Sequence, residues 1–182
     1  IIYSLRLIQI LKGCGCTVYL VMSEAAIRTL KHEVDLQYAK DILSNVDAIF
    51  DNNDIGCSLA SGSFSYDIFV VIPCSVNTIG IIHSGIANTL IGRCAIVAQK
   101  ERRQIVLVPR EMPMSTLTLK QLYELSLLGI SVCVASPGFY AHPKKMEDLI
   151  DFVIYKVLNV IGIKSDLIPE WNTHDGYSFL PI

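Results

Sequence analysis

Short, almost wholly apolar runs that alternate with longer amphipathic segments constrain the fold of this chain more than any other feature. Residues 67–72, 104–108 and 130–135 are apolar at nearly every position. A strand has this composition when both of its faces are buried, as in a parallel sheet with helices on both sides. The sequence therefore predicts an α/β fold, a Rossmann-like or flavodoxin-like three-layer sandwich with a parallel sheet.

The remaining segments extend this alternation of strands and helices. Apolar residues at helical spacing predict a first helix over residues 1–12, which ends at Gly13. We expect further strands at 17–22 and 48–50, and further helices at 24–32, 36–43, 75–100 (interrupted near Ser84), 117–128 and 146–161. Residues 45–66 are rich in Asn, Asp, Gly and Ser and predict a long irregular loop. Such a loop is usually functional or covered by a partner.

The composition predicts that copies of this chain cover part of each other's surface. Apolar residues make up 52% of the 182 residues, and the mean hydropathy is +0.46. A chain of this length cannot bury so much apolar area in its own core, so we expect a homo-oligomer. The net charge of −2 and the lack of a basic stripe argue against nucleic-acid binding. No apolar run predicts a membrane span or a secretory signal, and we expect a cytoplasmic protein.

The cysteines and histidines predict neither a disulfide framework nor a metal site. Cys14 and Cys16 are too close for an ordinary disulfide and lack partners at zinc-site spacing. Cys74 has no histidine nearby in the sequence, so we interpret it as a core or pocket residue rather than a nucleophile. His83 and His142 have no carboxylate at helical spacing, and we expect no metal.

Polar side chains follow several predicted strands at the point where each strand ends. Ser23 follows the strand at 17–22, and Ser75 and Thr78 follow the strand at 67–72. The carboxyl ends of parallel strands meet at one edge of the sheet, where ligands bind. A serine or threonine that opens a helix there can help the helix N-terminus to bind an anion or the polar edge of a flavin. The same residue types are equally typical of plain helix caps.

Charged and aromatic side chains follow the next two strands. Arg110 and Glu111 come directly after the run at 104–108, and Tyr140 follows the run at 130–135. A cation beside a carboxylate suits a phosphorylated ligand and proton transfer, although a surface ion pair has the same sequence. Tyr140 can line a pocket with its hydroxyl as a polar handle, or belong to a turn. Ser61 and Ser63 flank a glycine in the long loop and could cradle a phosphate or be solvated.

Six short motifs, in one order, together resemble a known family. They are Ala60-Ser61-Gly62-Ser63, Pro73-Cys74-Ser75-x-x-Thr78, Asn88-x-Leu90-Ile91-x-Arg93, Lys100-Glu101-Arg102-Arg103, Leu107-Val108-Pro109-Arg110-Glu111-x-Pro113 and Pro137-Gly138-Phe139-Tyr140. With matching spacing over residues 1–171, they closely resemble the flavin prenyltransferase family, whose members act beside ubiquinone-type decarboxylases. The resemblance implies a dodecamer, reduced FMN as prenyl acceptor, dimethylallyl mono- or diphosphate as donor, no metal, and a partner decarboxylase that receives prenylated FMN.

The same resemblance implies roles for individual residues. Those that match catalytic positions are Glu111, Lys100, Tyr140 and Glu33, with Glu111 as the proton-transfer residue. Those that match flavin contacts are Ser23, Ser75, Thr78 and Arg110. Those that match contacts to the prenyl phosphate or prenyl chain are Lys100, Arg93, Tyr140, Lys156, Trp171 and Ser61. Some of these contacts would cross subunit boundaries. We expect one flavin-binding domain at 1–163 and a tail at 164–182 that packs over the site or a neighbouring subunit.

Three features depart from the family pattern. The family's first strand and its Gly-Ala-Ser-Gly loop, which binds the flavin phosphate, would precede Ile1 and are missing from this sequence. Lys156 stands where some members carry arginine, which keeps the charge but loses the bidentate fork. Ile55 stands where some members carry tryptophan.

Two other functions remain open. An FMN-dependent cysteine decarboxylase of the phosphopantothenoylcysteine or lantibiotic type shares the fold and a loop like residues 73–78. Such an enzyme would not be expected to keep Lys100 with Arg110 and Glu111, and His32 is the one candidate for its early catalytic histidine. The other alternative is a non-catalytic flavin-binding regulatory oligomer, which the retention of Lys100, Glu111 and Tyr140 disfavours.

Overall fold

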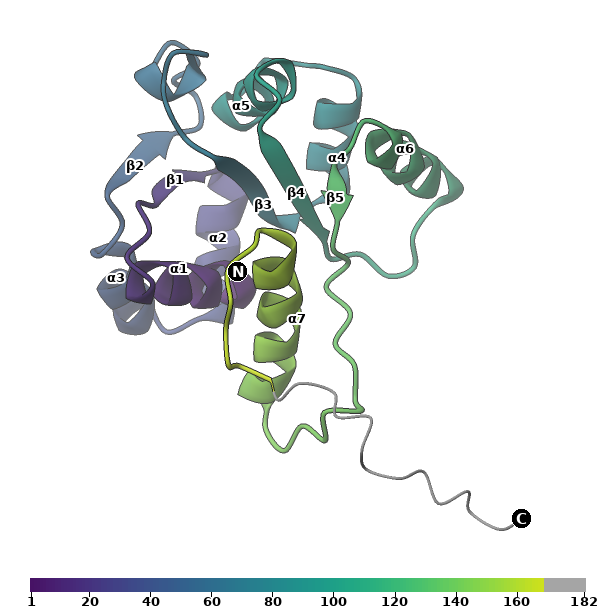
Figure 1. Cartoon of the computed structure of the whole chain (residues 1–182). Helices are drawn as coiled ribbons and strands as arrows, with labels where there is room; N and C mark the ends of the chain where they lie inside the picture. Colours follow the sequence, from purple (N-terminus) through teal and green to yellow (C-terminus); the bar gives the residue numbers. More distant parts are fainter. Residues whose placement is uncertain (169–182) are drawn as a thin grey trace.

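The computed structural model describes residues 1–168, which form helices on both sides of parallel strands (Figure 1). The strands are β1 (Tyr19–Met22), β2 (Ala48–Asp51), β3 (Ile68–Cys74), β4 (Gln104–Pro109) and β5 (Ser131–Val132). Every strand pair is parallel, and β4 lies between β3 and β5. The predicted α/β fold class is confirmed.

The helices cover the two faces of the β3–β4–β5 sheet in separate groups. One face carries α1 (Ile2–Gly13) and α7 (Met146–Val160), and the other carries α4 (Val76–His83), α5 (Leu90–Lys100) and α6 (Thr116–Leu127). Along β4, Ile105 and Leu107 pack into the second group, whereas Val106 and Val108 pack against α1 and α7. Each of these four side chains is at most 3% exposed, which explains why the run at 104–108 is apolar throughout.

Hydrogen bonds divide the strands into two groups rather than one continuous sheet. β1 pairs with β2, and β3, β4 and β5 form the second group. Helix α1 joins the two, because Leu5 and Ile8 pack with Val18 of the β1 side while Leu7 packs with the α7 side. The cluster around α1 also includes residues of α2 (Glu24–Glu33) and α3 (Leu36–Leu43).

Two predicted segments differ from the structure. The strand predicted at 130–135 is assigned only over β5, yet the amides of Cys133 and Ala135 still donate to the carbonyls of Leu107 (2.8 Å) and Pro109 (2.9 Å). Within the segment predicted as a loop at 45–66, β2 confirms the strand expected at 48–50, whereas the short helix η1 (Ser58–Ala60) was not predicted. Residues of η1 are buried against α5, so part of this segment is covered by the chain itself.

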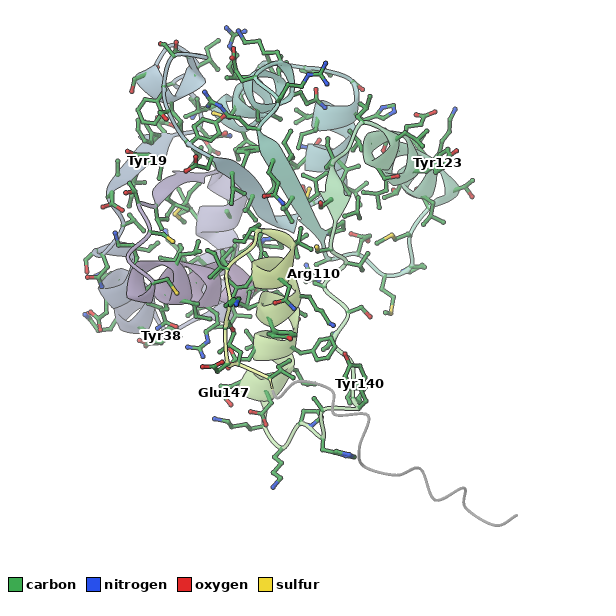
Figure 2. The ribbon with its side chains drawn as sticks, viewed as in Figure 1. Tyr19, Tyr38, Arg110, Tyr123, Tyr140 and Glu147 are labelled. Carbon is green, nitrogen blue, oxygen red and sulfur yellow. The ribbon has the colours of Figure 1, made fainter. Side chains whose placement is uncertain are left out.

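The apolar excess of the composition is visible on the surface of α6. Leu119, Tyr123 and Leu127 are spaced four residues apart and so share one helix face. Their exposed fractions are 54%, 63% and 68%, and Figure 2 shows Tyr123 on the outer side of the helix. We call these three residues the α6 stripe. A contiguous exposed patch of this kind usually marks an interaction site. No helix within residues 1–168 is long and apolar enough to cross a bilayer.

Candidate active site

The junction between β3 and α4 offers hydrogen-bonding groups at the carboxyl edge of the sheet. Ser75 caps α4, because its Oγ accepts from the amide of Thr78 at 3.2 Å and lies 3.0 Å from Thr78 Oγ1. The first amides of α4 have no partner within the helix and can donate to an oxygen-rich ligand. The cap and the ligand contact are therefore compatible functions of the same serine.

Arg110 and Glu111 follow β4 at the same edge, and both side chains are exposed. Neither takes part in a salt bridge within residues 1–168, so the surface ion pair that the sequence left open does not form. Figure 2 shows Arg110 between the ends of the central strands and α7. The guanidinium and the carboxylate are thus both available to a ligand. We call Ser75, Thr78, Arg110 and Glu111 the β4 rim.

A third group lies where the segment after β5 passes α7. The rings of Tyr140 and the buried Phe152 meet edge to face, with centroids 5.3 Å apart. Lys156 Nζ lies 5.6 Å from the centroid of the Phe152 ring. Phe152 is therefore a common packing partner of the phenol and the ammonium. A Cβ atom on Gly138 would lie 2.8 Å from both aromatic rings, which explains a glycine at this position.

Three residues that are predicted to contact the prenyl phosphate lie along α5 and in its neighbouring loop. Lys100 ends α5, and Arg93 lies two turns earlier on the same helix face, about 10 Å away along the axis. Ser61 Oγ lies 2.8 Å from Ser63 Oγ in the adjoining loop. The Nζ atom of Lys100 would be 3.3 Å from a Cβ on Gly62, so this loop lies against the lysine. We call Ser61, Arg93 and Lys100 the α5 cluster.

The β4 rim and Lys100 lie at opposite ends of the same strand. Lys100 precedes β4 whereas Arg110 follows it, and the six residues of β4 span about 20 Å. Within one copy, the structure brings Ser75, Thr78, Arg110 and Glu111 to one edge but does not bring Lys100 to them. Tyr140 and Lys156 share Phe152 as a neighbour.

The other predicted residues are more dispersed. Ser23 caps α2 by accepting from the amide of Ala26 at 3.2 Å. Glu33 ends α2, about 15 Å from Ser23, and its Oε2 accepts from the amine of Ile1 at 2.7 Å. Trp171 lies outside the described residues.

Burial makes the thiol at the carboxyl edge a poor nucleophile. Burial raises the pKa of the Cys74 thiol to about 12, so the reactive thiolate is scarce at neutral pH. This agrees with the interpretation of Cys74 as a core residue.

Sequence reasoning missed Phe152, and it gave no individual role to Arg103 within the motif Lys100-Glu101-Arg102-Arg103. The spacing of Phe152 four residues before Lys156 on α7 was an available signal, since such residues share a helix face.

The chain is also similar to known proteins. A family model described as Flavoprotein matches residues 1–158. The flavin prenyltransferase UbiX of Thermoplasma acidophilum is 42% identical over 171 residues, which cover 93% of this chain and 92% of that protein.

Two solved structures are close in shape. AnUbiX, solved in complex with FMN and dimethylallyl pyrophosphate, has a TM-score of 0.90 and 33% identity, with 94% of this chain and 90% of that chain covered. A dodecameric FMN-dependent UbiX-like decarboxylase from Escherichia coli O157:H7 has a TM-score of 0.89 and 36% identity, with 93% and 92% covered.

The fold, the free groups at the carboxyl edge and the family model together define a flavodoxin-like flavoprotein. The identity to relatives over nearly the whole chain is specific enough to go further. This chain belongs to the flavin prenyltransferase family, and it is a transferase. The FMN-dependent cysteine decarboxylase TvaF is only 15% identical, with a TM-score of 0.54, and shares the fold alone.

Proposed function

We propose that this chain transfers a dimethylallyl group from dimethylallyl phosphate or diphosphate to reduced FMN, at N5 and C6 of the flavin. The observation that carries the proposal is that Arg110 and Glu111, at the end of β4 and beside the capped start of α4, form no salt bridge within residues 1–168. Such a cation and carboxylate suit an anionic ligand whose reaction also moves a proton. The prenylated FMN then passes to a partner decarboxylase, and we place the reaction in the cytoplasm.

The residues of the β4 rim fit FMN. The hydroxyls of Ser75 and Thr78 and the first amides of α4 can bond to oxygens of the flavin or its phosphate. Arg110 adds a fixed cation with several donors, which suits phosphate or a ring carbonyl. When bound and reduced, FMN supplies the nucleophilic nitrogen and carbon. We propose that Ser23 adds a flavin contact from the start of α2, whereas Glu33, at the other end of that helix, stays a predicted catalytic residue.

The cationic residues act on the donor. The C–O bond between the dimethylallyl group and the phosphate breaks, so negative charge grows on the leaving phosphate and positive charge on the allyl group. Lys100, Arg93 and Lys156 can stabilise the phosphate, and Tyr140 can donate its hydroxyl proton to a phosphate oxygen. The new bond to N5 would replace the C–O bond, with loss of the N5 proton. The second bond, to C6, would form once the prenyl double bond takes up a proton at one carbon and C6 attacks the other. C6 would then lose its own proton, which we propose that Glu111 accepts.

Lys100 and Glu111 can act on one donor if two copies of the chain meet. The two side chains lie at opposite ends of β4 in one copy, so we propose that the α5 cluster of one copy faces the β4 rim of another. The E. coli relative is described as dodecameric, and we propose the same assembly here. We also propose that residues 1–163 form the flavin-binding domain. Residues 169–182 of the predicted tail, with Trp171, lie outside the described part of the chain.

The α6 stripe gives a prediction about assembly. Leu127→Glu places a charge in an exposed apolar face and should shift the dodecamer to smaller, folded species, because burying an unpaired carboxylate is costly. Mass photometry measures the assembly and circular dichroism the fold. Leu36→Glu changes an exposed leucine on α3 and should leave the assembly intact. A full-size assembly of the Leu127→Glu variant would show that the stripe is not an interface.

The direct test of the proposed function is anaerobic incubation of the full protein with reduced FMN and dimethylallyl monophosphate, followed by mass spectrometry of the released flavin. We expect a flavin that is heavier by one dimethylallyl group, and a parallel run with the diphosphate shows which donor is used. Unmodified FMN with both donors would overturn the proposal.

A further inference from the structure

The guanidinium of Arg103 is built into the loop that carries Ser61. Its Nη2 donates to the backbone carbonyls of Gly62 and Phe64, at 2.8 Å each. Arg103 lies between α5 and β4, three residues after Lys100. One side chain thus ties two carbonyls of the loop to the end of the helix that carries the lysine.

An aromatic ring fixes the same guanidinium on its face. Arg103 Cζ lies 4.0 Å from the centroid of the Tyr66 ring, a favourable cation–π distance. The Tyr66 hydroxyl in turn donates to the carbonyl of Cys94 in α5 at 3.4 Å. Groups of residues 62–66 therefore set the orientation of the guanidinium both in its plane and above it, and Tyr66 links them to α5.

The arrangement is costly for a purely structural contact. Arg103 Nη1 is buried and has no hydrogen-bond partner among the described residues. Arg103 is partly buried, and the unsatisfied Nη1 donor disfavours folding. We therefore expect the guanidinium to contribute to function rather than to stability. A lysine could not replace it, because lysine lacks the planar fork of donors.

We infer that Arg103 is a positioning residue for the donor phosphate, an inference that rests on the proposed function. By holding the carbonyls of Gly62 and Phe64, it keeps the hydroxyl of Ser61 and the ammonium of Lys100 on one surface. A phosphate can then be bound by both groups at once. Glu101 Oε1 lies 3.3 Å from Lys100 Nζ and competes with the phosphate for the lysine. A fixed Ser61 hydroxyl therefore contributes more to phosphate binding.

The test compares Arg103→Lys with Arg102→Lys. Arg102 is the adjacent, exposed arginine, so the second variant makes the same chemical change outside the loop contacts. We expect Arg103→Lys to raise the KM for dimethylallyl phosphate by about tenfold while kcat and FMN affinity change little, because ground-state binding of the donor is lost. Arg102→Lys should behave as the wild type does. Tyr66→Leu, which removes the ring, should raise the same KM.

Pyrophosphate binding separates this inference from the proposed function. Titration of the assembled protein with pyrophosphate by calorimetry needs no catalysis, and Arg103→Lys should weaken binding by about tenfold relative to the wild type. Failure of the wild type to prenylate FMN would contradict the proposed function alone. Equal pyrophosphate affinity of wild type and Arg103→Lys, with a change only in melting temperature, would show that Arg103 is merely structural. Normal affinity in Tyr66→Leu would contradict the inference as well.

Discussion

Glu111→Gln should slow FMN prenylation by a factor of about 10²–10⁴ while FMN still binds. Glutamine has nearly the same shape and can still form hydrogen bonds, but it cannot accept the proton that leaves the flavin carbon. The side chain is exposed and takes part in no salt bridge within residues 1–168, so the substitution removes no structural ion pair. Single-turnover reactions under anaerobic conditions, quenched and analysed by mass spectrometry, measure the rate.

Glu147→Gln is the matched control for this prediction. Glu147 is an exposed glutamate in the first turn of α7, away from the carboxyl ends of the strands (Figure 2). Its substitution should leave the rate close to that of the wild type. A Glu111→Gln rate equal to that of this control would show that Glu111 takes no part in proton transfer, and would favour a non-catalytic flavin carrier.

Lys100→Met should lower kcat/KM for the donor by about 10²–10³, because it removes a fixed cation from the leaving phosphate. Methionine keeps most of the aliphatic length of the side chain, and the one ion pair of Lys100 in the described part of the chain, with Glu101, is solvent-exposed. Such a pair contributes little to stability, so the fold should be retained. Steady-state kinetics with varied donor, together with FMN binding followed by fluorescence, measure the effect.

Lys31→Met, at an exposed position near the end of α2, controls for the loss of one positive charge. It should leave kcat/KM unchanged. Comparable losses in both variants would mean that overall charge, rather than a contact between Lys100 and the phosphate, governs donor binding.

The sequence predicted the sheet and its carboxyl edge because both depend on local pattern. The apolar run of β4 is buried on both faces, and Ser75 caps α4 as its position after a strand predicts. The order of the elements along the chain also separates two of the predicted site residues. Lys100 precedes β4 and Arg110 follows it, so the two cannot share one edge within a single copy.

Other features depend on contacts between distant segments and could not be predicted. The amides of Leu90 and Ile91 donate to the backbone and side-chain oxygens of Asn52, at 2.8 Å and 3.1 Å. These bonds order a segment whose composition is typical of an irregular loop. In the same way, the fit of Gly138 between the rings of Tyr140 and Phe152 is set by the packing of a loop on α7.

Prenyl transfer should take place where the Lys100 of one copy meets the Glu111 of another. Mixing the inactive Lys100→Met and Glu111→Gln proteins in equal amounts, dissociating them and allowing them to reassemble tests it directly. If the two residues come from different copies, about a quarter of the sites regain both native side chains. Mass spectrometry of the flavin should then show prenylated FMN at about that fraction of the wild-type rate. If both residues act within one copy, no mixed assembly contains an intact site, and the mixture should remain as inactive as either variant alone, which would contradict the account.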